Sequence, residues 1–189
     1  VAGAVAETVL DAVLSVSDLR RAYVNNGGDI ALYLRSDATF DVAMAGTDGA
    51  ALGKITLDVH SKVRGIATSG QGGRSLSFGI ADSVTVLAET ASAADVAATL
   101  IASAVDIVDH PQIARVPAQT VCDDTDLGQR RVVVGVGDLS AQDIDRALQN
   151  GEQCARNMQR QGLIRSASLH LRGQSRQVDL NSEKVLEHA

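Results

Sequence analysis

Aromatic side chains are scarce in this sequence, at 2% of 189 residues with no tryptophan, and there are only two prolines. Basic residues are outnumbered by acidic ones, which gives a net charge of −6 at pH 7. Nucleic-acid binding usually needs a basic surface and stacking rings, and anionic membranes also attract basic patches, so both partners are disfavoured. No apolar run is long and uncharged enough to span a bilayer, and the first residues lack the basic, apolar and small-residue pattern expected of a secretion signal.

Cysteine is also rare. Cys122 and Cys154 lie far apart and outside a C-x-x-C pattern. A disulfide between them is one alternative, but we expect reduced thiols and a cytoplasmic protein. The length suits a single domain over residues 1–189 with a core of Ala, Val, Leu and Ile. The chain opens on Val1 without methionine, and we expect an upstream N-terminal segment to be missing. Leu186-Glu187-His188 at the other end is either native or the remnant of a tag.

Hydrophobic periodicity predicts a mixture of helices and strands. Helices are expected over 4–14, from 17–18 to 22, over 93–105 and from 140 to about 161, and strands over 23–25, 30–34, 40–45, 54–60, 83–88, 131–136 and 167–172. Residues 110–129 look irregular and 172–176 are expected to form a solvated turn. Because strands and helices do not alternate regularly, the pattern predicts an α+β fold rather than a doubly wound α/β fold.

The Ala-rich segment 91–99 carries the most distinctive polar pair. Asp95 and Thr99 are four residues apart, so on a helix they share one face. Two hard oxygen donors with room for waters and a phosphate suit Mg²⁺. The structural alternative is that Ser92 caps the helix, Asp95 sits favourably in its first turn and Thr99 bonds its own i−4 carbonyl.

Two glycine-bearing segments are candidate ligand loops. Asn26-Gly27-Gly28-Asp29 either brings backbone N–H groups and polar side chains to a ligand or is simply a hairpin turn. The segment 67–79 contains Thr68, Ser69, Gly70, Arg74 and Ser75, whose hydroxyls, backbone donors and guanidinium suit a phosphate. It is equally well explained as a flexible surface loop. Asp82, just before the strand 83–88, either joins Asp95 at a cation or is a solvated strand end.

In sequence order, four segments resemble the ApbE superfamily of flavin transferases. They are Val1-Ala2-Gly3-Ala4-Val5-Ala6-Glu7, Asn26-Gly27-Gly28-Asp29-Ile30, Ala67-Thr68-Ser69-Gly70, and Ser83-Val84-Thr85-Val86 with Ala94-Asp95-Val96-Ala97-Ala98-Thr99. The longer stretch 68–86, the strand 131–136 and the end 162–174 are more similar to a sister branch, uncharacterised protein family 0280. The resemblance covers most of the chain.

The resemblance implies an ApbE-like mixed fold, with antiparallel-rich sheets flanked by helices. ApbE enzymes use Mg²⁺ to cleave FAD and attach FMN to a protein Ser or Thr. Their metal is held by an Asp and a Thr four apart, which match Asp95 and Thr99. Their Gly-Gly-Asp turn lies against the flavin nucleotide and matches Gly27, Gly28 and Asp29.

Three departures from the family pattern bear on function. The family's Lys-Gly-Tyr falls on Ala2-Gly3-Ala4, its Asp becomes Glu7, and its His-x-x-Asp-Pro is replaced by residues 78–82. One hypothesis is therefore Mg²⁺-dependent binding or transfer of FAD, FMN or another nucleotide. The alternative is a non-catalytic module that keeps the fold and binds a nucleotide or small anion. A weaker third hypothesis is a homo-oligomer that packs through its Ala-rich helices.

Overall fold

The computed structural model describes residues 1–45, 51–73 and 75–179. Within those ranges it contains three α-helices and ten strands. In chain order the elements are α1 (Ala2–Val16), β1 (Arg21–Asn26), β2 (Asp29–Leu34), β3 (Phe40–Ala45), β4 (Ala51–Leu57), β5 (Gly65–Ser69), β6 (Ser83–Ala88), α2 (Ala91–Ala104), β7 (Ile113–Pro117), a 3-10 turn (Ala118–Thr120), β8 (Arg131–Val136), α3 (Ala141–Arg160), β9 (Ser166–Leu171) and β10 (Gln174–Val178).

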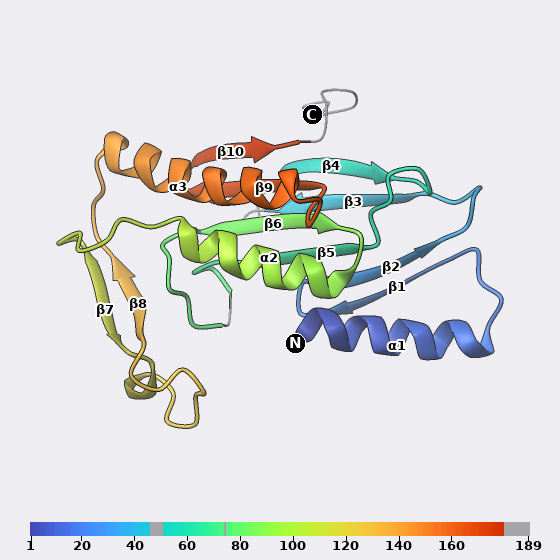
Figure 1. Cartoon of the computed structure of the whole chain (residues 1–189), viewed down its shortest axis with the longest axis horizontal. Coiled ribbons are helices and arrows are strands. Elements are labelled where there is room, and N and C mark those ends of the chain that lie inside the picture. Colours follow the sequence, from blue (N-terminus) through green and yellow to red (C-terminus); the bar gives the residue numbers. More distant parts are fainter. Residues whose placement is uncertain (46–50, 74, 180–189) are drawn as a thin grey trace.

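The centre of the molecule is a six-stranded sheet in the order β1-β2-β5-β6-β9-β10. Every neighbouring pair in it is antiparallel. The three helices lie on one face, with α1 over β1 and β2, α2 over β5 and β6, and α3 over β9 and β10 (Figure 1). The predicted α+β class is confirmed.

The main core lies between the sheet and the helices. It consists of alternate strand side chains that point towards the helices and of small residues that let the two layers approach closely. Val84 and Val86 of β6 point towards α2 and are fully buried in one cluster with Ala98 and Ile101 of the helix. A Cβ atom at Gly65 of β5 would lie 2.1 Å from the carbonyl oxygen of the residue before α2. The helix can therefore lie directly on the sheet, and its position is fixed by these contacts.

Two hairpins complete the molecule. The β3–β4 hairpin contributes to a second buried cluster, in which Leu57 packs with Leu32, Ile66 and Leu87 of the sheet. The β7–β8 hairpin projects away from the sheet, at the end where α2 finishes (Figure 1). No helix in the described ranges combines the length and apolar character needed to cross a bilayer.

Four sequence predictions about the elements are wrong. The candidate loop segment 67–79 begins as a strand, because residues 67–69 belong to β5. The short helix expected to run to Ala22 is absent, because β1 begins at Arg21 and pairs with β2 along its whole length. The segment 110–129 contains β7, whose partner β8 lies beyond the acidic stretch. The segment 172–176 starts with a tight turn at Arg172 and Gly173, both with positive φ, and continues as β10. Most side chains of this edge strand are polar, so its sequence lacks the alternation of apolar and polar residues that predicts a strand.

Candidate functional site

The start of α1 packs directly against the first turns of α2. A Cβ atom at Gly3 would lie 2.3 Å from the carbonyl oxygen of Ala91 and 2.9 Å from the Cβ of Asp95. Only glycine permits this approach, since real Cβ contacts do not fall that short. The junction places the Asp95 side chain at the N-terminus of α1, where unpaired N–H groups favour a carboxylate.

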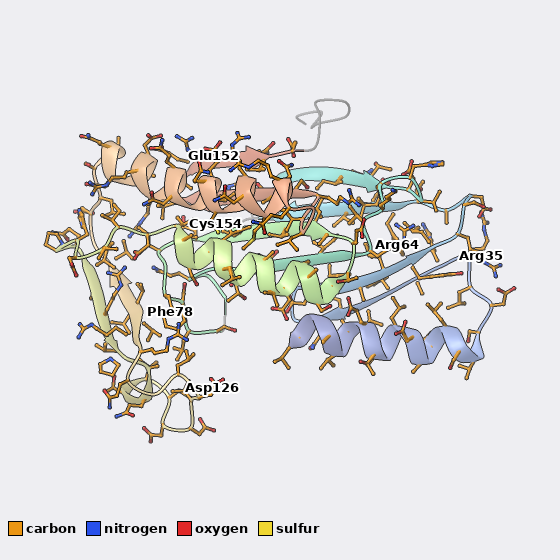
Figure 2. The ribbon with its side chains drawn as sticks, in the orientation of Figure 1. Arg35, Arg64, Phe78, Asp126, Glu152 and Cys154 are labelled. Atoms are coloured by element: carbon orange, nitrogen blue, oxygen red, sulfur yellow. The ribbon has the colours of Figure 1, made fainter. Side chains whose placement is uncertain are left out.

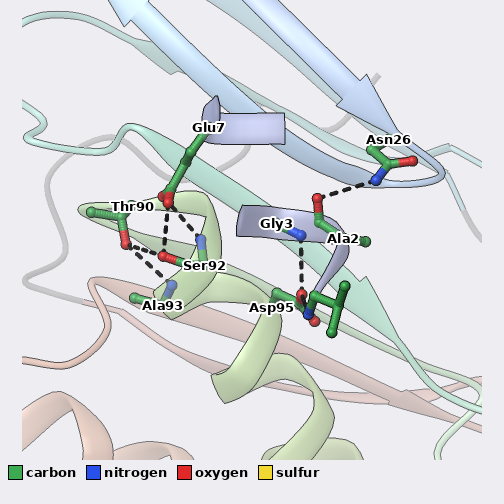
Figure 3. A network of polar contacts seen from close by, with 9 residues as sticks. Ala2, Gly3, Glu7, Asn26, Thr90, Ser92, Ala93 and Asp95 are labelled. Carbon is green, nitrogen blue, oxygen red and sulfur yellow. Dashed lines mark hydrogen bonds and ion pairs between the residues drawn. The ribbon is translucent and has the colours of Figure 1, made fainter. Parts of the chain in front are cut away.

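Asp95 accepts two hydrogen bonds at this junction (Figure 3). Its Oδ2 atom lies 3.0 Å from the Gly3 backbone nitrogen and 2.8 Å from the Val1 amino nitrogen. Burial by itself would raise the pKa of the Asp95 carboxyl, but these hydrogen bonds outweigh it and hold the pKa below its ordinary value. Asp95 is therefore a carboxylate at neutral pH.

A second carboxylate makes the reciprocal contact from α1 to α2. Glu7 accepts hydrogen bonds from the Ser92 backbone N–H at 3.0 Å and from the Ser92 hydroxyl at 2.9 Å. The N-cap of α2 is Thr90, whose hydroxyl accepts from the Ala93 N–H at 3.1 Å. The predicted cap at Ser92 is therefore wrong, because Ser92 is already inside the first turn and its hydroxyl bonds Glu7 (Figure 3).

The segment 26–29 forms the tight turn of the β1–β2 hairpin. Asn26 pairs with Asp29, and both glycines between them have positive φ, 68° at Gly27 and 111° at Gly28. A two-residue hairpin loop needs this backbone shape, which explains the glycines without a ligand. The turn also contacts the site, since the Asn26 side-chain amide donates to the Ala2 carbonyl at 3.2 Å.

The hairpin brings a second carboxyl group, Asp29, close to Asp95. Burial first, and then the negative charge of Asp95, raise the pKa of Asp29 to about 6, although the Val1 amino group partly offsets them. A carboxyl with that pKa is partly protonated just below neutral pH.

Thr99 lies one helical turn after Asp95 and is exposed to solvent. Its backbone carbonyl accepts a hydrogen bond from the Ser103 hydroxyl at 2.8 Å. Thr99 therefore faces solvent, whereas the Asp95 side chain is only 17% exposed at the junction with α1.

The loop after β5 is pressed against the strand that follows it. Gly70 has a φ of 142°, and a Cβ atom there would lie 2.7 Å from the Asp82 carbonyl oxygen. The N–H groups of Gln71 and Gly72 donate to the carbonyls of Ala81 and Asp82, at 2.8 and 3.2 Å. These two backbone donors are therefore used by the protein itself and are not free to bind a ligand.

The candidate loop residues point in different directions. Ala67 is buried in the core beneath α2, so Ser69 shares its side of β5 whereas Thr68 faces the opposite side. There the Thr68 hydroxyl lies 2.9 Å from the Thr85 hydroxyl. Ser75 is exposed, and Arg74 lies outside the described residues.

Further along, the loop is joined to the β7–β8 hairpin. The Ser77 carbonyl accepts from the Val133 N–H at 2.9 Å, and the Arg130 guanidinium lies 4.2 Å from the centre of the Phe78 ring. Figure 2 labels Phe78 at this junction. The loop thus runs beside the C-terminal half of α2, whereas the start of α1 lies against its N-terminal half (Figure 1).

Asp82 does not join Asp95 but bonds the turn between β9 and β10. Its carboxylate accepts a hydrogen bond from the Arg172 backbone N–H at 2.6 Å, at the turn between β9 and β10. Next to it, the Ser168 hydroxyl lies 2.8 Å from Nε2 of His170. Asp82 also raises the pKa of His170, but burial has the larger effect and lowers that pKa below its ordinary value. This polar group is built around the hairpin of β9 and β10 and does not involve Asp95.

Gln71 is a candidate residue that sequence reasoning missed. Its side-chain amide nitrogen is buried and has no hydrogen-bond partner among the described residues. Buried donors are nearly always paired, so this amide is available to a water molecule or to a ligand. A glutamine in a polar loop gives no sequence signal of this kind, because its burial is known only once the loop is folded.

No group of three or more His, Cys, Asp or Glu side chains is arranged to hold a metal ion within the described ranges. A cation at Asp95 and Thr99 would therefore take most of its ligands from water and from a bound phosphate. Mg²⁺ commonly binds in this way, through one or two carboxylates, several waters and substrate phosphates.

Comparison with known proteins gives consistent results. A family model described as AbpE bacteria matches residues 1–177. A UPF0280 protein of Methanobrevibacter smithii is 40% identical over 107 residues, which are 54% of this chain and 43% of the relative. A UPF0280 protein of Methanopyrus kandleri is 35% identical over 136 residues, which are 71% of this chain and 54% of the relative. The chain thus spans about half the length of these curated relatives.

Proposed function

Because the chain belongs to the family described as AbpE bacteria, we propose that it binds the phosphates of a flavin or another nucleotide through Mg²⁺ held by Asp95 and Thr99. The proposal rests on the resemblance to ApbE flavin transferases, in which a matching Asp and Thr hold the metal. We also propose that the protein works in the cytoplasm, in keeping with its two unpaired cysteines.

The observation that carries the proposal is the meeting of Asp29 and Asp95 beside an exposed Thr99. The two carboxyl groups come from a hairpin and a helix that are far apart in the sequence, and their mutual repulsion helps to raise the pKa of Asp29. A divalent cation would remove that repulsion. The donors are all oxygens, as Mg²⁺ requires. Bound there, the ion would neutralise the negative charge of the phosphates.

The loop after β5 supplies the second half of the proposed site. We propose that the unpaired Gln71 amide, together with Ser69 and Ser75, donates hydrogen bonds to the ligand. FAD, FMN and ADP are the probes that distinguish which part of a nucleotide is recognised.

We propose that the protein binds the nucleotide without transferring part of it to another protein. Ala2 and Ala4 stand where the family has Lys and Tyr, and neither can contribute a charge or a proton. The residues at 78–82 lack the family's His and Pro. Incubation with FAD, Mg²⁺ and candidate acceptor proteins tests this restriction, because release of AMP at turnover rates would show that transfer is retained.

Isothermal titration of the whole chain with FAD, FMN and ADP, in Mg²⁺ and in EDTA, tests the binding. We expect removal of the metal to weaken binding at least about tenfold, since the ion is expected to screen phosphate charge. Asp95→Asn keeps an oxygen that can accept from the Gly3 N–H, and it removes the charge. We expect this variant and Thr99→Val to lose the Mg²⁺ dependence.

Asp11→Asn is the matched control. Asp11 is an exposed carboxylate on α1, and neutralising it should leave nucleotide binding unchanged. The proposal is wrong if the wild-type chain binds none of the three nucleotides, or if Asp95→Asn binds them as the wild type does.

A further inference from the structure

β1 is an edge strand whose outer side is ready for pairing. Among the described residues it pairs only with β2. The Arg35 N–H donates to the Arg20 carbonyl at 2.9 Å, and antiparallel bonding alternates along the ladder. The backbone groups of Arg21, Tyr23 and Asn25 therefore point to the free edge. The strand contains no proline, lysine or bulge, which are three of the features by which natural edge strands resist pairing, and its one charged residue is Arg21 at its start.

On the helix side of this edge, α1 exposes a row of valines. Val5, Val9, Val13 and Val16 recur every three or four residues, and they are 46, 45, 38 and 82% exposed. The buried side of the same helix is also apolar, with Ala6 and Leu10 packed on the sheet. A helix that is apolar on two sides is expected to be covered on both.

On the opposite side of the edge there is a shallow hollow of about 500 Å³, lined by residues that include Arg21, Thr39 and Phe40. Its wall contains Tyr23, which is 62% exposed and whose ring lies 5.9 Å from the Phe40 ring, edge to face. An added strand would therefore place alternate side chains over the valine row and over this hollow.

We propose that the occupant is a second copy of this chain, related by a two-fold axis, so that β1 pairs antiparallel with β1 of the partner subunit. Because α1 lies over both β1 and β2, its axis is set back from the edge by about half a strand spacing. With strands about 4.8 Å apart, the two α1 helices would then run antiparallel about 10 Å apart. That separation is the usual distance between packed helices, and the two valine rows would meet across it.

The register and charges also suit a second copy. Residues on the same sheet face must pair, and we take the register that overlaps residues 21–25 of both strands. Tyr23 then faces Tyr23 of the partner subunit, and Arg21 faces the partner's Asn25. No like charges are opposed in this register, and the valine row contains no charged residue. The carboxylates of α1 lie elsewhere on the helix, with Glu7 bonded to Ser92. Antiparallel helices also bring opposite ends of their dipoles together.

The other edge of the sheet differs. On the helix side of β10, Arg176 forms ion pairs with Asp145, at 2.6 Å, and with Glu152 of α3. A second strand there would meet a charged cluster in place of an apolar row. Pairing between copies is therefore expected at β1 and not at β10.

Sedimentation velocity of the whole chain tests the proposal. We expect a species of twice the 19.6 kDa chain mass. Val9→Lys places a charge in the middle of the valine row, and we expect it to weaken association at least about tenfold. Val134→Lys is the control, because Val134 is similarly exposed, at 50%, but lies on the distant hairpin strand β8. Circular dichroism confirms that each variant is folded.

Hydrogen exchange provides the second readout. In the wild type the Arg21, Tyr23 and Asn25 amides should be protected, and in Val9→Lys they should exchange as free amides while those of β2 stay protected. A wild-type monomer would overturn the proposal. So would a dimer that Val9→Lys and Val134→Lys affect equally, which would place the interface elsewhere.

Discussion

Asp95 has a structural task that its sequence position alone does not reveal. The helical spacing predicted a carboxylate and a hydroxyl on one face of α2, and the structure places both there, with Thr99 exposed. The same carboxylate also caps the start of α1, a helix that begins 93 residues earlier in the chain. That contact depends on tertiary packing, so no local pattern could have predicted it.

Asp29 should make stability depend on pH in an unusual direction. Its pKa is raised from 3.8 to about 6 in the fold, so the folded state holds a proton that the unfolded chain releases between about pH 4 and 6. Stability should therefore fall as pH rises through this window. We expect Asp29→Asn to abolish the fall and to stabilise the protein at pH 7, because it removes the partly buried negative charge. The gain should be only about 1 kcal/mol, because solvent screens part of the repulsion.

Urea unfolding of both proteins in EDTA, at pH 4 and pH 7, measures this effect. Equal stability differences between the two proteins at both pH values would show that Asp29 ionises normally. Mg²⁺ added at pH 7 should stabilise the wild type, since the cation would offset the repulsion between Asp29 and Asp95.

At the scale of elements, α1 and α2 are joined by a reciprocal exchange of acidic side chains. Glu7 of α1 bonds the first turn of α2, and Asp95 of α2 bonds the first turn of α1. Each carboxylate satisfies N–H groups that a helix leaves unpaired at its start. The exchange holds the start of α1 against α2. Because the hairpin turn at 26–29 contacts Ala2, it also holds this turn near α2.

The close crossing of these helices depends on Gly3. We expect Gly3→Ala to destabilise the protein by about 2 kcal/mol, because its new Cβ would overlap the Ala91 carbonyl oxygen and force the helices apart. Gly135→Ala is the control, since its Cβ would meet only an ordinary contact at 3.9 Å. Thermal unfolding of both variants provides the comparison.

The separation of the helices should also weaken the proposed cation site, so Gly3→Ala should bind Mg²⁺ and ADP less well than Gly135→Ala. If the two glycine variants were equally stable, α1 would not be held against α2 as closely as described.

Sequence patterns predicted elements whose own residues carry the signal. The core strand β6 and the helix α2 were placed correctly within a few residues, because their apolar positions repeat at the period of the element. β10 was missed because its outward residues are polar, as on many edge strands. β7 was missed because its partner lies beyond a long acidic connection, so that its pairing depends on tertiary structure.

For the whole molecule, the arrangement of the sheet brings the hairpin turn and Asp95 together on the helix-covered face. The hairpin turn and Asp95 meet because β1, β2 and α2 are brought together by α1, which contacts all three. The residues of the loop after β5 were predicted as one group, and β5 alternation separates them, with Ser69 on the α2 side and Thr68 on the other. Composition could identify the loop but not the direction of each side chain.

The central claim is that a divalent cation and a nucleotide meet at Asp29, Asp95 and Thr99. Mn²⁺ can replace Mg²⁺ at oxygen sites, and it broadens the NMR signals of nearby amides. With ADP and substoichiometric Mn²⁺, we predict selective broadening of amides at the hairpin turn 26–29, the start of α1 and the Asp95–Thr99 turn of α2. Broadening centred elsewhere, or the same pattern in Asp95→Asn, would contradict the account.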